Sequence, residues 1–209
     1  MPIFYFCGIN INRIKMTNMK LLHAKVFSFI IIFLMTSSFI QAQDFNLSNS
    51  ESSIKVLGTS NVHDWELKSE KQTGSLVVEN LDNFQLKGLN VTITTESLKS
   101  GKSGMDKNTY KALKTKSYKT INFQLAEVKK VENNGSKKFK VTTTGDLTIA
   151  GVKKRVSLDF SATVSGNTIT LTGEKTLKMT DYKVDPPTAL LGAISTGDEV
   201  TIKFSTIFK

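Results

Sequence analysis

Apolar and polar residues alternate most strictly over residues 156–164. The apolar positions are Val156, Leu158, Phe160, Ala162 and Val164, and serine, aspartate and threonine residues lie between them. A period of two places the apolar side chains on one face of a β-strand and the polar side chains on the other. Ala150 and Gly151 separate this run from an apolar pattern that ends at Ile149, so the sequence predicts a β-hairpin here.

Shorter runs of the same kind recur along the chain, with turn residues between them. They cover residues 54–56, 62–67, 76–78, 86–93, 121–131, 139–149, 169–171 and 200–204. We expect residues 62–67 to begin a long strand that Gly74 interrupts and that residues 76–78 resume. About eight strands separated by turns predict an antiparallel barrel or sandwich.

Two segments depart from the strand pattern. Ser103 and Asp106 have the spacing of a capping box, and residues 105–113 are compatible with a short helix. Residues 182–192 contain Pro186 and Pro187, which would remove hydrogen-bond donors from a central strand. We therefore expect a partly apolar loop there.

The first 42 residues differ from the rest. Basic residues precede an apolar run at residues 26–35, and small residues follow it up to Ala42. This order predicts a secretory signal peptide that is removed near Ala42, which leaves residues 43–209 as one periplasmic or secreted domain. An uncleaved membrane anchor is the alternative, but residues 26–40 are shorter than the roughly 20 residues that a spanning helix needs.

The inventory of reactive side chains argues against an enzyme. Cys7, the single cysteine, lies in the predicted leader, so residues 43–209 have no thiol. His63 is their only histidine, and strand alternation points it away from Asp64 and Glu66. We therefore expect no metal site, no nucleophilic triad and no cofactor other than a bound amphiphile.

Charge is a weaker guide to function. Loss of the leader lowers the net charge from +10 to +6, because the leader carries four basic residues and no acidic one. Lysines gather between Lys107 and Lys119 and again at residues 153–155. They form either a solvated face or a surface that attracts anionic lipid head groups. Nucleic acid is not expected, because aromatic residues are not interleaved with the lysines.

Three passages are distinctive: residues 58–66, residues 105–123 and residues 145–154, the first of which contains the sequence His63-Asp64-Trp65-Glu66. In their order and spacing they resemble the YceI-like family of polyisoprenoid-binding or lipid-binding proteins, and the first passage has the form of one subgroup. The resemblance extends over about residues 46–208. It implies an all-β fold, an extended, lipocalin-like antiparallel barrel of about eight strands with one short helix. It also implies export, an isoprenoid or other amphiphile in the lumen, and no catalytic residues.

The resemblance and the alternation together predict which side chains face the lumen. These ligand-binding candidates are His63, Trp65, Phe123, Leu125, Leu147, Ile149, Leu158, Phe160, Leu190, Leu191 and Phe204. For Trp65 and His63 the alternative is a core tryptophan beside a hydrogen-bonded histidine. Leu190 and Leu191 are expected either to cap the barrel end or to form a lid over the ligand entrance.

These observations favour a carrier that holds a long apolar ligand. The alternative is a ligand-free interaction module whose barrel is fully packed and whose basic face docks on a partner or envelope surface. Neither interpretation, carrier or interaction module, excludes a homodimer.

Overall fold

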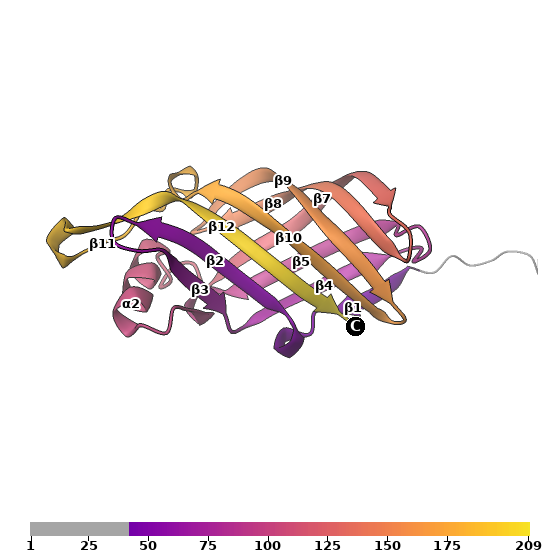
Figure 1. Ribbon diagram of the computed structural model, residues 1–209, viewed down its shortest axis with the longest axis horizontal. Coiled ribbons are helices and arrows are strands. Elements are labelled where there is room, and N and C mark those ends of the chain that lie inside the picture. The colour runs from indigo at the N-terminus through magenta and orange to yellow at the C-terminus, as the bar shows by residue number, and fades with distance from the viewer. Residues whose placement is uncertain (1–41) are drawn as a thin grey trace, which may run out of the picture. The chain divides into compact units, whose positions relative to one another are not determined.

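Antiparallel strands form the wall of the protein in the computed structural model, which describes residues 42–209 (Figure 1). The strands are β1 (Gln43–Asn46), β2 (Ser53–Ser60), β3 (Trp65–Ser69), β4 (Gln72–Val78), β5 (Leu86–Thr94), β6 (Leu98–Lys99), β7 (Thr120–Asn133), β8 (Lys138–Ile149), β9 (Val152–Ser165), β10 (Thr168–Lys178), β11 (Thr188–Ala189) and β12 (Ile194–Phe208). The helices are α2 (Ser103–Ala112) and the 3₁₀ turns η1 (Asn49–Glu51), η2 (Thr95–Ser97), η3 (Thr180–Tyr182) and η4 (Leu190–Gly192). The predicted all-β fold with one short helix is confirmed for the described residues.

The strands form one sheet that curls on itself. Its order is β1-β4-β5-β7-β8-β9-β10-β12-β2-β3-β6, and β11 pairs with β12 outside this path. At one edge, the Asn46 amide donates to the Lys209 carbonyl at 2.7 Å. The Ser48 amide donates to the Ile207 carbonyl at 2.8 Å. These contacts join the β1 edge to the end of β12, and the result is a barrel. Among the described residues, every strand lies between Gln43 and Phe208.

The strand count exceeds the expected eight because one predicted run is divided and three short strands, β1, β6 and β11, lie outside the predicted runs. Residues 62–78 form two strands, β3 and β4, with the turn at Glu70 and Lys71 rather than at Gly74, which lies inside β4. The predicted hairpin is confirmed: β8 and β9 pair from Lys138 to Ile149 around Ala150 and Gly151. Both turn residues have positive φ, 46° and 78°, as a type I′ turn requires.

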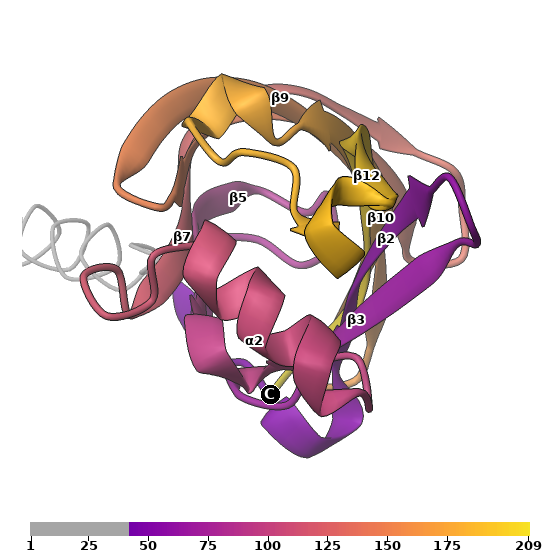
Figure 2. The same ribbon diagram turned by 90° about the vertical axis from the view of Figure 1, so that its left-hand side faces the viewer.

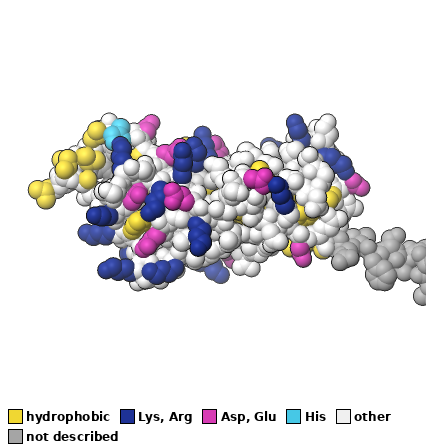
Figure 3. All heavy atoms as spheres, turned by 90° about the horizontal axis from the view of Figure 1, so that it is seen from below, with side chains coloured by type: hydrophobic (Ala, Val, Ile, Leu, Met, Phe, Trp, Pro, Cys, Tyr) yellow, Lys and Arg dark blue, Asp and Glu magenta, His cyan; other side chains and the backbone are white. Residues whose placement is uncertain are grey.

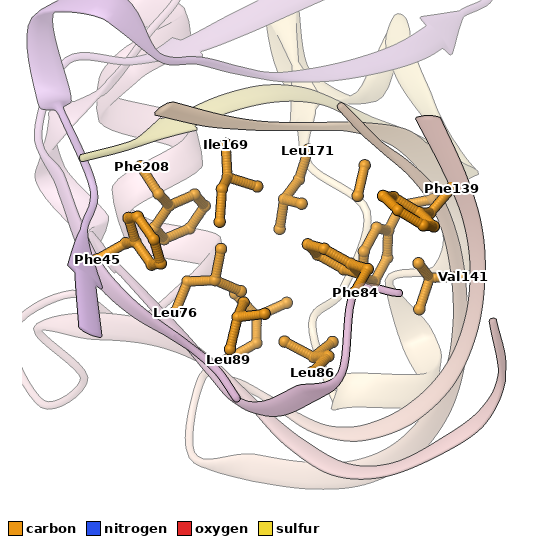
Figure 4. Close-up of a cluster of buried hydrophobic side chains, with 13 residues drawn as sticks. Phe45, Leu76, Phe84, Leu86, Leu89, Phe139, Val141, Ile169, Leu171 and Phe208 are labelled. Atoms are coloured by element: carbon orange, nitrogen blue, oxygen red, sulfur yellow. The ribbon is translucent and has the colours of Figure 1, made fainter. Parts of the chain in front are cut away.

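One end of the barrel is filled by side chains. The alternating face of β9 points inward there, and Phe160 is 3% exposed. The loop between β4 and β5 folds Phe84 into this end, where its ring stacks on Phe139 with centroids 5.4 Å apart. Figure 4 shows the cluster, which consists of Phe45, Leu76, Val78, Phe84, Leu86, Leu89, Phe139, Val141, Phe160, Ala162, Ile169, Leu171 and Phe208. We call this the closed end.

The opposite end is covered by other segments. Helix α2 and the loop between β10 and β12 lie across it (Figure 2). A second, smaller buried cluster forms under them from Leu147, Ile149, Ala150, Tyr182 and Val184. We call this the mouth end.

The predicted leader lies outside the described residues. No helix within residues 42–209 is long and apolar enough to cross a membrane.

Candidate functional site

A cavity of about 560 Å³ lies inside the barrel at the mouth end. Its wall is aliphatic, because the inward positions of seven strands carry isoleucine, leucine or valine. These wall residues are Ile54, Val56, Leu67, Ile93, Ile121, Ile149, Leu177, Val200 and Ile202. Small-molecule sites in proteins are commonly of this size and this apolar character.

Helix α2 forms one side of the cavity and is fastened at both ends. Its lining residues are Gly104, Met105, Lys107, Asn108, Thr109 and Ala112. Near its end, the Tyr110 hydroxyl donates to the Glu96 carbonyl at 2.8 Å and accepts from the Lys99 ammonium at 2.6 Å. These bonds position the helix over the barrel.

The start of the helix differs from the predicted capping box. Lys102 is the N-cap residue and no side chain caps the first turn. Asp106 instead accepts hydrogen bonds from the Ser100 hydroxyl at 2.6 Å and the Ser100 amide at 2.8 Å. Burial raises the pKa of the Asp106 carboxyl, but these bonds and Lys99 outweigh it and hold the pKa below its usual value. The carboxylate therefore fixes the loop before α2.

The loop after β10 forms the other side. It contributes Met179, Tyr182, Val184, Pro187, Thr188 and Ala189 to the lining. Asp198 of β12 holds its first turn, since it accepts from the Thr180 amide at 2.9 Å and the Thr180 hydroxyl at 2.7 Å. Lys154 of β9 donates to Asp181 at 3.1 Å. The cavity thus lies between α2 and the loop after β10, and hydrogen bonds attach both segments to the barrel.

Trp65 and His63 both line the cavity. The indole of Trp65 lies against Gly58 of the neighbouring strand, and its Nε1 donates to the Thr59 carbonyl at 2.9 Å. His63 is exposed, and its Nδ1 lies 2.8 Å from the Asp64 carbonyl oxygen. Trp65 therefore presents an apolar ring face to the cavity, while its indole N–H is hydrogen-bonded within the barrel wall.

The charged part of the lining is basic. Lys102 and Lys107 line the cavity, and no Asp or Glu of the described residues does so. A more polar hollow of about 430 Å³ adjoins it and shares His63, Trp65, Lys102 and Met105 with it. This hollow has mixed charge, because Asp64, Glu66 and Glu70 line it together with Lys68, Lys99 and Lys102.

The structure places the predicted lumen residues at different depths. Of these candidates, His63, Trp65 and Ile149 line the cavity. Phe160 belongs to the closed-end cluster. Four other candidates pack against this cluster: Phe123, Leu125, Leu158 and Phe204. Leu147 lies in the second cluster beside Ile149. Leu190 and Leu191 are exposed and lie outside the lining. Contact of any of these residues with a ligand stays a prediction.

Several lining residues were missed because strand alternation identifies a face and not a depth. Ile121 and Ile202 lie two positions from Phe123 and Phe204 on the same strand faces, a displacement of about 7 Å along each strand. Helix residues such as Met105 and Asn108 carried no periodic signal, since no residue of α2 is buried.

Side chains that could ligate a metal are scattered over the described part. Between residues 42 and 209, no three His, Cys, Asp or Glu side chains lie close enough together to hold a metal ion. His63, the one histidine there, contacts a backbone carbonyl rather than a hydroxyl nucleophile.

Similar solved structures share this architecture. Burkholderia cenocepacia BcnA is 20% identical with a TM-score of 0.63, over 77% of this chain and 98% of that one. A polyisoprenoid binding domain from Saccharophagus degradans is 12% identical with a TM-score of 0.63, over 79% and 97% of the two chains. The Campylobacter jejuni YCEI protein is 21% identical with a TM-score of 0.55, over 66% and 80%. At these identities the likeness shows a common fold.

No curated protein matches the chain. The model of the YceI-like domain matches residues 44–208, which include every strand of the barrel except the first residue of β1. The chain therefore belongs to the YceI-like family.

Proposed function

We propose that this protein is an exported carrier that holds a long apolar ligand, an isoprenoid chain or another amphiphile, in the cavity at the mouth end. The observation that carries the proposal is the aliphatic cavity of about 560 Å³ with a basic rim. The name of the similar Saccharophagus degradans domain, which describes it as polyisoprenoid binding, supports the ligand class. Export is inferred from the basic and apolar pattern of residues 1–42.

Apolar burial is sufficient to hold such a ligand. Each CH₂ group that leaves water contributes about 0.8 kcal/mol, so a chain of several isoprene units needs no strong polar contact. Lys102 and Lys107 at the rim favour a polar or anionic head group over a cationic one. No covalent step is required of the protein.

The direct test is to purify the protein from its native host, extract it with organic solvent and analyse the extract by mass spectrometry. We expect an apolar or amphiphilic compound in stoichiometric amount. Val56→Phe should exclude it, because Val56 lines the cavity, whereas Leu57→Phe should retain it, because Leu57 points to the opposite face of β2. The absence of any bound amphiphile from wild-type protein would contradict the proposal.

A second test uses Trp65, the only tryptophan of the chain. Because its indole lines the cavity, entry of geranylgeraniol, a linear isoprenoid alcohol, should change the intensity and position of its fluorescence. The change should saturate for wild type and Leu57→Phe and be lost in Val56→Phe. A fluorescence change that is equal in all three proteins would show that the alcohol does not enter the cavity.

A further inference from the structure

Exposed apolar side chains gather at the mouth end. Leu190 is 73% exposed and Leu191 109% exposed in the loop between β11 and β12, and Val62 is 61% exposed in the turn between β2 and β3. We call these three residues the apolar tip. Among the described residues, the one other exposed large apolar side chain is Tyr118, which is only 38% exposed and lies against Gly151.

The backbone holds the leucines outward. Leu190 and Leu191 have φ of 49° and 58°, in the left-handed region that costs a leucine free energy. Asn61 joins the two parts of the tip: its Nδ2 donates to the Ala193 carbonyl at 2.9 Å and its Oδ1 accepts from the Ser195 amide at 3.0 Å. A strained backbone that exposes leucine side chains does not stabilise the fold. It is instead a feature expected of a binding surface.

A group of cationic residues lies at the same end. Residues 100–119, which comprise α2 and its flanking loops, contain six lysines and one acidic residue. The lysine group is Lys102, Lys107, Lys111, Lys114, Lys116 and Lys119, and all six are exposed. Within the described part of the chain none of them forms an ion pair, although eleven ion pairs form elsewhere on that part. Figure 3 shows hydrophobic side chains at the projecting end and basic side chains gathered near them.

We propose that the mouth end docks on the surface of an anionic lipid bilayer. The apolar tip inserts between the lipid head groups, and the lysine group contacts anionic head groups around it. Both attractions act together, as in interfacial membrane anchors, and a basic residue near an anionic surface strengthens binding. The proposal concerns this surface alone and does not depend on what the cavity holds, although docking would bring the cavity opening to the membrane.

Charge favours a bilayer over a second copy of the chain. A symmetric dimer through the tip would bring two lysine groups face to face, and like charges oppose such an interface. An anionic lipid surface instead complements them. The tip also projects from the barrel, a shape suited to insertion (Figure 1).

The test measures co-sedimentation of the chain from Gln43 to Lys209 with vesicles of phosphatidylcholine, alone or with about one-third phosphatidylglycerol. We expect binding to the anionic vesicles that falls as salt rises. Leu190→Ser with Leu191→Ser should lower the partition coefficient at least about tenfold, because two exposed leucines no longer leave water. Lys111→Glu with Lys116→Glu should lower it at least about 30-fold, because two attractions are lost and two repulsions are added.

The matched control is Lys138→Glu with Lys140→Glu, which changes net charge equally at the start of β8, near the closed end. It should retain binding to within about threefold, since these lysines lie far from the proposed surface. An equal loss in both charge variants would show that net charge alone is responsible and would overturn the proposal. So would wild-type protein that binds no vesicle, or a dimer that the leucine variant abolishes without any effect on vesicle binding.

Discussion

The indole ring of Trp65 occupies the space that a side chain at Gly58 would need. The two residues are direct partners in the β2–β3 ladder, and a Cβ atom at Gly58 would come within 2.1 Å of Cζ2 of Trp65. Glycine at this position lets the ring lie flat along the wall, where one face contacts the cavity. The geometry of the candidate site thus depends on a residue that has no side chain.

Gly58→Ala should displace the indole and destabilise the protein by about 1–3 kcal/mol, the usual cost of overpacking. The displaced ring would lose its hydrogen bond to the Thr59 carbonyl, so its fluorescence maximum should shift. Urea unfolding and fluorescence spectra measure both effects.

The control is Gly104→Ala in α2, where a Cβ atom would meet nothing within 4 Å. It should leave stability unchanged or raise it by up to about 1 kcal/mol, since alanine favours a helix. In a Trp65→Leu background, Gly58→Ala should cost less stability than it does in the presence of Trp65. Equal costs of Gly58→Ala with and without Trp65 would refute the steric explanation.

Alternation predicted the wall of the barrel correctly but not how its interior is divided. The inward face of β9 and the hairpin at Ala150 follow from local sequence. The division depends on which distant segments enter each end: Phe84 fills one end from a loop, and α2 covers the other without a buried residue. Such contacts are tertiary, and a period of two carries no information about them.

The exposed leucines illustrate the same limit. Apolar residues in a loop were expected to cap the barrel or cover its entrance, and the structure turns Leu190 and Leu191 outward. Their direction is set by left-handed backbone conformations and by the bonds of Asn61, which lies far away in the sequence. Neither feature has a signature in the local pattern.

Gly151→Ala should destabilise the protein more than Gly166→Ala. Both glycines occupy hairpin turns with positive φ, 78° and 56°, so each alanine should cost about 1–2 kcal/mol in backbone strain. Only at Gly151 would the new Cβ also meet the ring of Tyr118, at 2.3 Å from Cε1. Thermal unfolding should show an additional loss for Gly151→Ala of about 1–3 kcal/mol. Equal losses would mean that Tyr118 moves aside freely.

Tyr182→Phe should leave stability unchanged or raise it by about 1 kcal/mol. Tyr182 is 2% exposed, and among the described residues its hydroxyl has no hydrogen-bond partner. Burial, with a smaller effect of Asp181, raises the pKa of this hydroxyl, so it stays neutral. Tyr110→Phe is the control and should cost about 1 kcal/mol, because the Tyr110 hydroxyl donates to Glu96. A larger loss for Tyr182→Phe would reveal a partner of its hydroxyl, such as a bound water.

Acid should loosen the loop after β10 through Asp198. Hydrogen bonds from the Thr180 side chain and amide lower the pKa of the Asp198 carboxyl. A lowered pKa means that the carboxylate stabilises the fold above its ordinary pKa, and that this contribution disappears as pH falls through the lowered value. The stability difference between wild type and Asp198→Asn should therefore be largest near about pH 7 and vanish near about pH 2, as measured by urea unfolding. Asp185→Asn is the control, at an exposed aspartate of the same loop that forms no hydrogen bond or ion pair with the described residues, and it should change stability little at pH 7. A difference for Asp198→Asn that is constant with pH would show that the carboxylate charge does not hold this loop.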